Sequence, residues 1–207
     1  MIDLYTWTTP NGRKVSIALE EMQLPYEAHA IDITKDDQFA PEFLAISPNN
    51  KIPAIRERET GFHLMESGAI LLWLAEKSGK FLPEGTRWEA MEWLMWQMAG
   101  FGPMLGQAHH FLQFKAGTSE YAEERYGAEA KRLYGVLEKR LTGRDFMLDD
   151  YSIVDMATWP WVSRFEWQRI DLDAFPNVRD WYLRIADRPA VQRGYDVPKV
   201  TTPIPKP

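Results

Sequence analysis

A proline before a short apolar run, followed a dozen residues later by an acidic residue and a serine, constrains this chain most. Pro53 of Lys51-Ile52-Pro53-Ala54 has no N–H for a sheet ladder, so it predicts a turn that leads into a strand. A cis bond before Pro53 would turn the backbone N–H and C=O of Ile52 outward, free to bind an extended peptide. Glu66-Ser67 opens the next apolar run, which predicts a helix with Ser67 as its N-cap. Because amides at a helix start attract carboxylates, the two features together suit a small peptide that carries carboxylates.

Each of these short patterns also has an ordinary structural explanation. An isolated Ile-Pro is usually a turn at the start of a strand, and Glu66-Ser67 is usually only a helix cap. Asn11-Gly12 is a common turn pair. Their order along one chain favours the functional interpretation over three separate explanations.

The composition limits the class of protein. The 207 residues have room for one large domain or two small ones, either with a real core. A net charge of −6 argues against general affinity for nucleic acid or for an anionic membrane. The longest apolar stretch, around residues 68–75, is far shorter than the ~20 residues that span a bilayer. Since residues 1–5 read directly as a strand, with no signal-like segment, we expect a cytoplasmic protein that binds neither nucleic acid nor membrane.

The chain contains no cysteine. It therefore has no disulfide framework, no thiolate metal site and no cysteine nucleophile, so any thiol chemistry must use a thiol that a ligand brings in. His109-His110 could suggest a metal site, but neighbours on a helix face different directions. No carboxylate follows three or four residues later, so we expect structural or pocket-lining histidines and no metal.

The first eighty residues predict an α/β domain. Residues 2–7 and 26–33 alternate as strands, and the apolar residues between them recur at helical spacing as far as about Gln23, which gives a βαβ unit. A short helix, two paired strands and a final helix are expected at residues 41–46, 52–56, 62–65 and 67–77. The predicted order is βαβ followed by ββα, in a domain of residues 1–80.

After a linker that contains proline and glycine, at residues 81–85, the pattern becomes helical throughout. Helices are expected at residues 88–114, 121–141, from 152 onward and at 175–186. Gly100, Gly102, Pro103 and Gly106 predict a kink or break in the first of them. Ser152 and Asp155 form a pattern like a capping box, a structural role. We expect an all-helical domain at 87–195 and an extended or disordered Pro-rich tail at 196–207.

The plan of an α/β half joined to an all-helical half resembles that of the cytosolic glutathione transferases, whose first domain is thioredoxin-like, over nearly the whole chain. The similarity is greatest to the bacterial Nu class, the glutathione-dependent disulfide-bond oxidoreductases, which also resemble a yeast nitrogen-regulatory prion protein. Five strings in the family's order carry the resemblance: Thr9-Pro10-Asn11-Gly12, Ser47-Pro48-Asn49-Asn50-Lys51-Ile52-Pro53-Ala54-Ile55, Glu66-Ser67-Gly68-Ala69-Ile70-Leu71, Gly102-Pro103-Met104-Leu105-Gly106-Gln107 and Tyr151-Ser152-Ile153-Val154-Asp155.

The resemblance implies contacts with both ends of glutathione. Ile52 would pair its backbone with the cysteinyl part, with Pro53 cis. Glu66 would hold the γ-glutamyl ammonium, and the hydroxyl and N–H of Ser67 would hold the carboxylate at the helix start. Lys51 would contact the glycyl end.

Four further features come from the same resemblance. Gln38 would also contact the glycyl end. Asn11 would meet the glutathione sulfur, with Thr9 close by, and these two are the candidate catalytic residues. Arg125, on the helical domain, would also reach glutathione. The family's dimers imply a homodimer in which the first domain packs against the partner's long helices.

The chemistry of such a site would depend on the bound thiol. A thiol at the start of the first helix feels the helix dipole and a donor from Asn11, and both favour thiolate. Other transferase classes place Tyr, Ser or Cys where this chain has Thr-Pro-Asn, which is a poorer acid–base group but still a hydrogen-bond donor. This departure favours thiol–disulfide exchange over fast conjugation.

We therefore expect a homodimeric enzyme that reduces small-molecule disulfides, with glutathione as both ligand and reductant and with organic hydroperoxides as possible further substrates. Two alternatives stay open: a transferase that conjugates glutathione to small electrophiles, and a non-catalytic glutathione-binding regulatory protein. The sequence leaves open the physiological substrate, whether one or two glutathione molecules bind per subunit, and the role of the tail.

Overall fold

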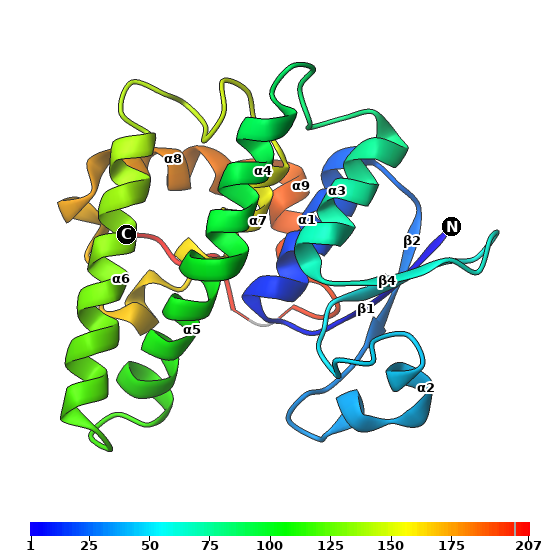
Figure 1. Ribbon diagram of the computed structural model, residues 1–207, viewed down its shortest axis with the longest axis horizontal. Helices are drawn as coiled ribbons and strands as arrows, with labels where there is room; N and C mark the ends of the chain where they lie inside the picture. Colours follow the sequence, from blue (N-terminus) through cyan, green and yellow to red (C-terminus); the bar gives the residue numbers. More distant parts are fainter. Residues whose placement is uncertain (201) are drawn as a thin grey trace. The chain divides into compact units, whose positions relative to one another are not determined.

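The structure is a computed structural model, and it describes residues 1–200 and 202–207. They form two compact units, Met1–Leu82 with Asp187–Ile204, and Pro83–Ala186 with Pro205–Pro207. Figure 1 shows the strands in the first unit and only helices among the labelled elements of the second. The predicted α/β plus all-α architecture is confirmed. Among the described residues, none of the helices combines the length and the apolar character needed to cross a membrane.

The first unit contains a four-stranded mixed sheet in the order β2-β1-β3-β4. β1 pairs with β2 in parallel and with β3 antiparallel, and β3 pairs antiparallel with β4. The strands are β1 (Ile2–Thr6), β2 (Tyr26–Ala30), β3 (Ala54–Glu57) and β4 (His63–Met65). The helical elements around them are α1 (Pro10–Met22), η1 (Asp37–Phe39), α2 (Pro41–Leu44) and α3 (Ser67–Ser78). This is the βαβ-ββα order expected from the sequence.

The position of α1 depends on one glycine. A Cβ on Gly12 would lie 2.2 Å from the backbone oxygen of Trp7, so only glycine lets the first turn of α1 approach the end of β1 this closely. Val15, Ala18 and Leu19 are fully buried, which anchors the inner face of the helix. The start of α1, with Asn11, is thereby fixed beside the sheet.

The helix α9 (Pro189–Tyr195) belongs to the first unit, whereas the sequence analysis placed residues up to 195 in the helical domain. Gly194 lies directly against α1, since a Cβ there would be 2.6 Å from the Cα of Ile17. The Arg13 guanidinium stacks 3.4 Å above the ring of Tyr195. The seven residues Pro189–Tyr195 are too few for their periodicity to show which unit they pack against, so the contacts between α9 and α1 decide the assignment.

The second unit consists of helices, of which the first four elements form a nearly continuous rod. They are α4 (Arg87–Trp96), η2 (Gln97–Phe101), α5 (Gly102–His109) and η3 (His110–Phe114). The kink or break predicted here takes the form of wide π-type turns in η2 and η3. The first of these turns ends at Phe101, two residues before Pro103, which has no N–H for a regular helical hydrogen bond.

The remaining helical elements complete the second unit. They are α6 (Glu120–Arg140), α7 (Ile153–Val162), η4 (Phe165–Gln168), η5 (Leu172–Ala174) and α8 (Pro176–Ala186). Ser152 caps α7: its Oγ accepts a hydrogen bond from the Val154 N–H at 3.2 Å, while the Asp155 carboxylate accepts from the Ser152 N–H at 3.0 Å. Asp155 also accepts from the Trp181 indole at 2.8 Å, so the cap ties α7 to α8.

The C-terminal tail makes specific contacts with both units. The Lys199 ammonium lies 4.1 Å from the ring centre of Trp7 in the first unit. In the second unit, the Tyr182 hydroxyl donates to the backbone oxygen of Pro205 at 2.7 Å. The described residues between 196 and 207 form neither helix nor strand, so these contacts are compatible with the extended tail that the sequence analysis expected; residue 201 lies outside the described residues.

Candidate functional site

A cavity of about 190 Å³ lies in the first unit, where the start of α1, the segment before β3 and the start of α3 meet. Six of the residues singled out in the sequence line it: Asn11, Lys51, Ile52, Pro53, Glu66 and Ser67. Ser47, Asn49 and Met65 complete the lining. Groups separated by more than fifty residues along the chain are thus brought together in one site.

The segment before β3 forms one wall. The Ile52–Pro53 peptide bond is cis, as the sequence analysis expected. The ladder between β3 and β4 ends at the pair Ala54 and Met65, so Ile52 lies beyond its last rung. The buried Ser47 hydroxyl donates to the backbone oxygen of Lys51 at 2.8 Å and holds the turn that precedes Ile52. The backbone N–H and C=O of Ile52 therefore lie at the end of the sheet, beyond its last paired residues.

The start of α3 forms the opposite wall, and it differs in one detail from the prediction. The helix begins at Ser67 itself, so the N-cap position belongs to Glu66 and not to Ser67. Glu66 has φ 71° and ψ 111°. Among the described residues of α3, none donates a capping hydrogen bond to the Glu66 side chain. The first amides of a helix have no partner within the helix, so this end offers donors and a partial positive charge to an anion.

A buried lysine lies behind this wall. Lys14 of α1 is 1% exposed, and its ammonium donates to the Ser67 hydroxyl at 3.5 Å. Burial lowers the pKa of Lys14 to about 7, while the nearby Glu66 carboxylate partly opposes the shift. Lys14 does not itself line the cavity, but it places a titrating cation directly behind Ser67.

The two candidate catalytic residues lie in different surroundings. Asn11 is in the first turn of α1 and lines the cavity. Thr9 is the N-cap of α1: its hydroxyl oxygen accepts a hydrogen bond from the Gly12 N–H at 3.2 Å. Thr9 is not among the described lining residues, so its visible contact is structural, although its hydroxyl proton remains available for donation.

Both halves of the chain match models of one family. Residues 8–77 match the model described as glutathione S-transferase, N-terminal domain, and residues 120–184 match its C-terminal domain. The disulfide-bond oxidoreductase YfcG of Escherichia coli K12 is 52% identical over 198 residues, which cover 92% of each chain. The chain belongs to the glutathione S-transferase family.

Solved structures of glutathione transferases support the same assignment. One from Pseudomonas putida, with one glutathione disulfide bound per subunit, has a TM-score of 0.91 and 45% identity, and the match covers 95% of this chain and 91% of that one. One from Burkholderia graminis, with two glutathione molecules bound per subunit, has a TM-score of 0.90 and 46% identity, covering 97% and 89%.

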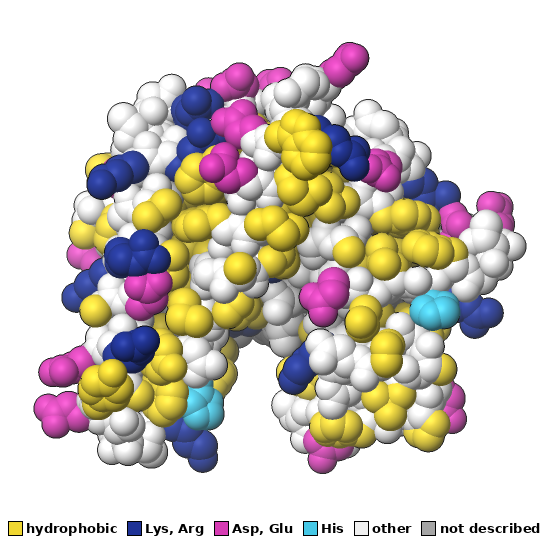
Figure 2. Space-filling model, viewed as in Figure 1, with side chains coloured by type: hydrophobic (Ala, Val, Ile, Leu, Met, Phe, Trp, Pro, Cys, Tyr) yellow, Lys and Arg dark blue, Asp and Glu magenta, His cyan; other side chains and the backbone are white. Residues whose placement is uncertain are grey.

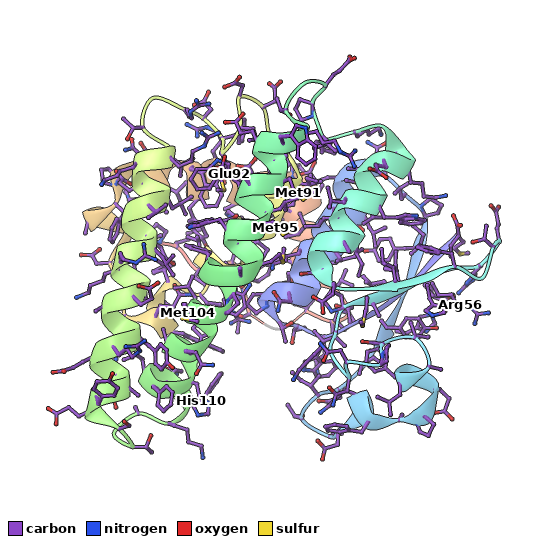
Figure 3. The ribbon with its side chains drawn as sticks, viewed as in Figure 1. Arg56, Met91, Glu92, Met95, Met104 and His110 are labelled. Atoms are coloured by element: carbon purple, nitrogen blue, oxygen red, sulfur yellow. The ribbon has the colours of Figure 1, made fainter. Side chains whose placement is uncertain are left out.

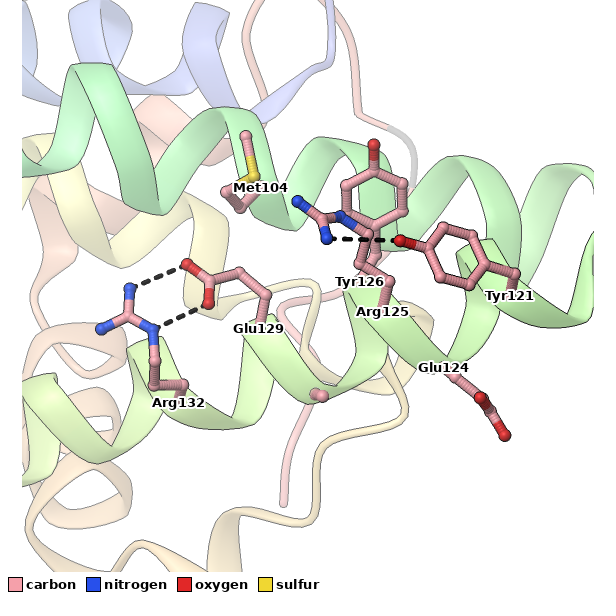
Figure 4. Close-up of a pocket in the computed structure, with 8 residues that line it drawn as sticks. Met104, Tyr121, Glu124, Arg125, Tyr126, Glu129 and Arg132 are labelled. Atoms are coloured by element: carbon pink, nitrogen blue, oxygen red, sulfur yellow. Dashed lines mark hydrogen bonds and ion pairs between the residues drawn. The ribbon is translucent and has the colours of Figure 1, made fainter.

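Besides Thr9, two further residues that the family resemblance singled out are absent from the described cavity lining. Gln38 is in η1, and its amide donates to Asp36 at 3.4 Å. Arg125 belongs to the second unit, where it lines a separate cavity of about 670 Å³. Figure 4 shows its guanidinium directed at the Tyr121 hydroxyl, 3.5 Å away. In the same cavity Arg132 makes two hydrogen bonds of 2.7 Å to Glu129.

The two neighbouring histidines lie in different surroundings, one buried and one exposed. His109 is buried beside Gln168, whose amide nitrogen lies 3.0 Å from the imidazole Nε2, and burial lowers the pKa of His109 to about 4. His110 is exposed (Figure 3). A different group of metal-ligand types, Asp3, Glu27 and His29, lies in the first unit, and the Arg58 guanidinium forms ion pairs with both of its carboxylates.

Sequence reasoning missed part of this cavity and its surroundings. Ser47, Asn49 and Met65 line the cavity, and Lys14 lies behind it. Ser47 and Asn49 fall within a string that the resemblance quoted, but only the folded turn shows that their side chains reach the site. Lys14 carries a weak sequence signal, a lysine among the apolar positions of an otherwise inward-facing helix.

Proposed function

We propose that the cavity of the first unit binds glutathione and that the protein is a glutathione-dependent disulfide-bond reductase. One observation carries the proposal: the cavity combines a main-chain edge at Ile52 with the open start of α3 at Ser67, in a chain that has no cysteine of its own. A peptide thiol with a carboxylate at each end matches these features.

The proposed contacts follow the lining residues. The backbone of Ile52 pairs with the cysteinyl part of glutathione. The exposed Glu66 carboxylate holds the γ-glutamyl ammonium, and Ser67 with the first amides of α3 holds the neighbouring carboxylate. The exposed Lys51 ammonium attracts the glycyl carboxylate. Pro53 keeps its structural role beside Ile52.

Gln38 and Arg125 complete the proposed set. Gln38 would need to turn from Asp36 toward the glycyl end, a small change for a half-exposed side chain held by one long hydrogen bond. Arg125 would offer its guanidinium to a glutathione carboxylate from its own cavity in the second unit.

The proposed reaction is thiol–disulfide exchange. Asn11 and the start of α1 stabilise the thiolate of bound glutathione, and the hydroxyl of Thr9 is a further donor. The thiolate attacks one sulfur of the substrate disulfide; that S–S bond breaks, and the departing sulfur takes up a proton. A second glutathione thiolate then attacks the mixed disulfide. The products are glutathione disulfide and two substrate thiols, so two glutathiones supply both electrons.

The relatives favour this chemistry over the alternatives. The E. coli relative is named as a disulfide-bond oxidoreductase, and the P. putida structure holds glutathione disulfide, which is the oxidised product of the proposed reaction. Organic hydroperoxides remain further candidate substrates, because a thiolate attacks peroxide oxygen in a similar way. Conjugation of small electrophiles is the alternative enzyme activity.

The assay that tests the proposal compares two reactions of the same purified protein. Glutathione-dependent reduction of 2-hydroxyethyl disulfide should be strong, and conjugation of chlorodinitrobenzene should be weak. The reverse result would favour an ordinary conjugating transferase. Glutathione binding without either turnover would favour a regulatory binding protein.

An Asn11→Ala variant then locates the chemistry. Asn11 lines the cavity but is proposed to act on the sulfur, so the variant should still bind glutathione while the rate of disulfide reduction falls by about 10–100-fold. Calorimetry gives the affinity and the reductase assay gives the rate. An unchanged rate would remove Asn11 from the mechanism.

A homodimer and a cytoplasmic location are also part of the proposal. Figure 2 shows apolar side chains gathered on the viewed surface. Within the second unit, α4 presents Met91 and Met95 (Figure 3), and Met95 is 49% exposed. Within the first unit, Phe62 is 40% exposed and stacks on Trp73. A glutathione reductant suits the cytosol, where the glutathione pool is kept reduced.

A further inference from the structure

Met65 is the last residue of β4, and its side chain has no role in the contacts proposed for glutathione. β4 lies at the edge of the sheet, where Met65 pairs with Ala54 at the last rung of the ladder with β3. The Met65 side chain is half-buried and lines the cavity of the first unit. Since the chain contains no cysteine, Met65 carries the sulfur atom of the described cavity lining. An oxidant that enters the cavity can therefore reach a thioether.

The Ser47 hydroxyl connects this sulfur to the segment before β3. The Ser47 Oγ donates to the backbone oxygen of Lys51 at 2.8 Å and lies 3.9 Å from the Met65 Sδ. A hydroxyl has a single proton and a thioether sulfur is a weak acceptor, so the proton goes to Lys51. The hydrogen bond that holds the turn before Ile52 therefore depends on a neighbouring sulfur that competes weakly for the same proton.

We propose that Met65 is a site of oxidation by organic hydroperoxides, and that its sulfoxide weakens the binding of glutathione in the cavity. The proposal rests on the proposed function, since it takes glutathione as the ligand of the cavity. The sulfur attacks the terminal oxygen of the hydroperoxide; an S–O bond forms and the O–O bond breaks. The sulfur is oxidised by two electrons to the sulfoxide, and the peroxide is reduced to an alcohol, which takes the proton from the transferred oxygen.

The sulfoxide changes both the hydrogen bonding and the polarity of this wall. Its oxygen is a strong acceptor on an atom that already lies next to the Ser47 hydroxyl, so it competes with Lys51 for the single proton. The turn before Ile52 then loses its hydrogen bond, and a polar group takes up part of a cavity of about 190 Å³. The loss of one hydrogen bond corresponds to a roughly three- to tenfold change in an equilibrium constant, and we expect glutathione affinity to fall by this factor.

The other methionines provide the contrast that a test needs. Met22, Met147 and Met156 are at most 2% exposed, which protects their sulfur atoms from an oxidant in solution. Met95 of α4 is 49% exposed and belongs to the second unit. Met95 should therefore oxidise at least as readily as Met65, without an effect on the cavity of the first unit.

The test treats the full-length protein with tert-butyl hydroperoxide in the absence of glutathione. Peptide mass spectrometry gives the oxidised fraction of each methionine. Calorimetry gives the affinity for γ-glutamyl-aminobutyryl-glycine, a glutathione analogue that contains no sulfur. We expect Met65 and Met95 to oxidise, and the affinity to fall by about three- to tenfold as Met65 is converted. Methionine sulfoxide reductases A and B should restore the affinity, because they reverse this modification.

Each variant is compared with itself before oxidation. Met65→Leu removes the sulfur at similar volume, so its own affinity should not change during the treatment. Met95→Leu is the matched control: it removes an exposed sulfur of the second unit and should lose affinity as the wild type does. When the analogue is present during the treatment, it should protect Met65 and leave Met95 oxidised.

The outcomes separate this inference from the proposed function. Met65 that stays reduced while Met95 oxidises, or an affinity that survives oxidation of Met65, would overturn the role of Met65 and leave the glutathione site standing. An equal loss of affinity in Met65→Leu would do the same. Failure of the untreated wild type to bind either the analogue or glutathione would overturn both proposals. The wild-type measurements decide the question even if Met65→Leu does not fold.

Discussion

At the scale of single residues, the site places two groups in costly positions. Glu66 takes a left-handed φ of 71°, which a residue with a side chain seldom adopts. Lys14 is enclosed as a titrating amine. Structures keep such residues when the surroundings hold them in place, and both lie against the start of α3. Their effects on binding and on stability can be separated by substitution.

Glu66→Ala and Glu66→Gly form a matched pair. Both remove the carboxylate proposed to hold the γ-glutamyl ammonium, so both should weaken glutathione binding by about 1–3 kcal/mol, measured by calorimetry. Only glycine relieves the backbone, so Glu66→Gly should unfold in urea with a free energy about 1 kcal/mol higher than Glu66→Ala. An unchanged dissociation constant in both variants would refute the assigned contact.

Lys14 also predicts how the stability of the ligand-free protein depends on pH. Burial lowers its pKa from 10.5 to about 7, so between these values the unfolded chain binds more protons than the folded one. The free energy of unfolding therefore gains a contribution from Lys14 that rises from about pH 7 toward pH 10, by at most ~1.4 kcal/mol per pH unit. Denaturation at several pH values should show this rise in the wild type. Lys14→Met should lack it, and equal slopes in the two proteins would contradict it.

At the scale of elements, α1 is the helix on which the first unit depends. It supplies Asn11 to the cavity, Lys14 behind it and the surface on which α3 and α9 pack. The approach of α9 is set by Gly194, whose backbone lies against that of Ile17. The stability of α1, and with it the position of Asn11, therefore depends on a helix close to the end of the chain.

Gly194→Ala tests this packing. The added methyl would lie 2.6 Å from the Cα of Ile17, so α9 must shift, and the free energy of unfolding should fall by about 1–3 kcal/mol. Gly135→Ala is the control: a Cβ there meets nothing within 4 Å in α6, so this variant should be neutral or more stable, by up to ~1 kcal/mol. Urea denaturation measures both. Equal effects would show that the α1–α9 contact is not tight.

At the scale of the whole molecule, the proposed homodimer is directly measurable. Light scattering should give twice the chain mass of 24.1 kDa. Met95→Lys should shift the equilibrium toward monomer, because it places a charge on an exposed apolar position of α4. The control variant Lys139→Met should keep the wild-type mass, if the shift toward monomer is specific to Met95→Lys. A wild-type mass of one chain at micromolar concentration would contradict the dimer.

The sequence predicts local order well, because periodicity and turn chemistry are local. The order of strands and helices in the first unit and the cap of α7 by Ser152 follow from such patterns. What it misses depends on contacts between distant segments. The place of α9 on α1, the burial of Lys14 and the participation of Ser47 in the cavity each require the folded neighbours. Thr9 shows the reverse case, since a residue proposed for chemistry has a visible role in capping α1.

The contact between α1 and α9 also bears on how the chain is made. The segment Asp187–Ile204 completes the first unit, yet it is translated after the helical residues Pro83–Ala186 of the second unit. Domains usually fold in the order of synthesis, from the N-terminal end. The packing of the first unit cannot be completed, and the surface around Ile17 stays uncovered, until the helical residues of the second unit have been translated. A nascent chain released before residue 187 would therefore lack part of the first unit, so complete packing of the first unit requires that the helical residues have already been translated.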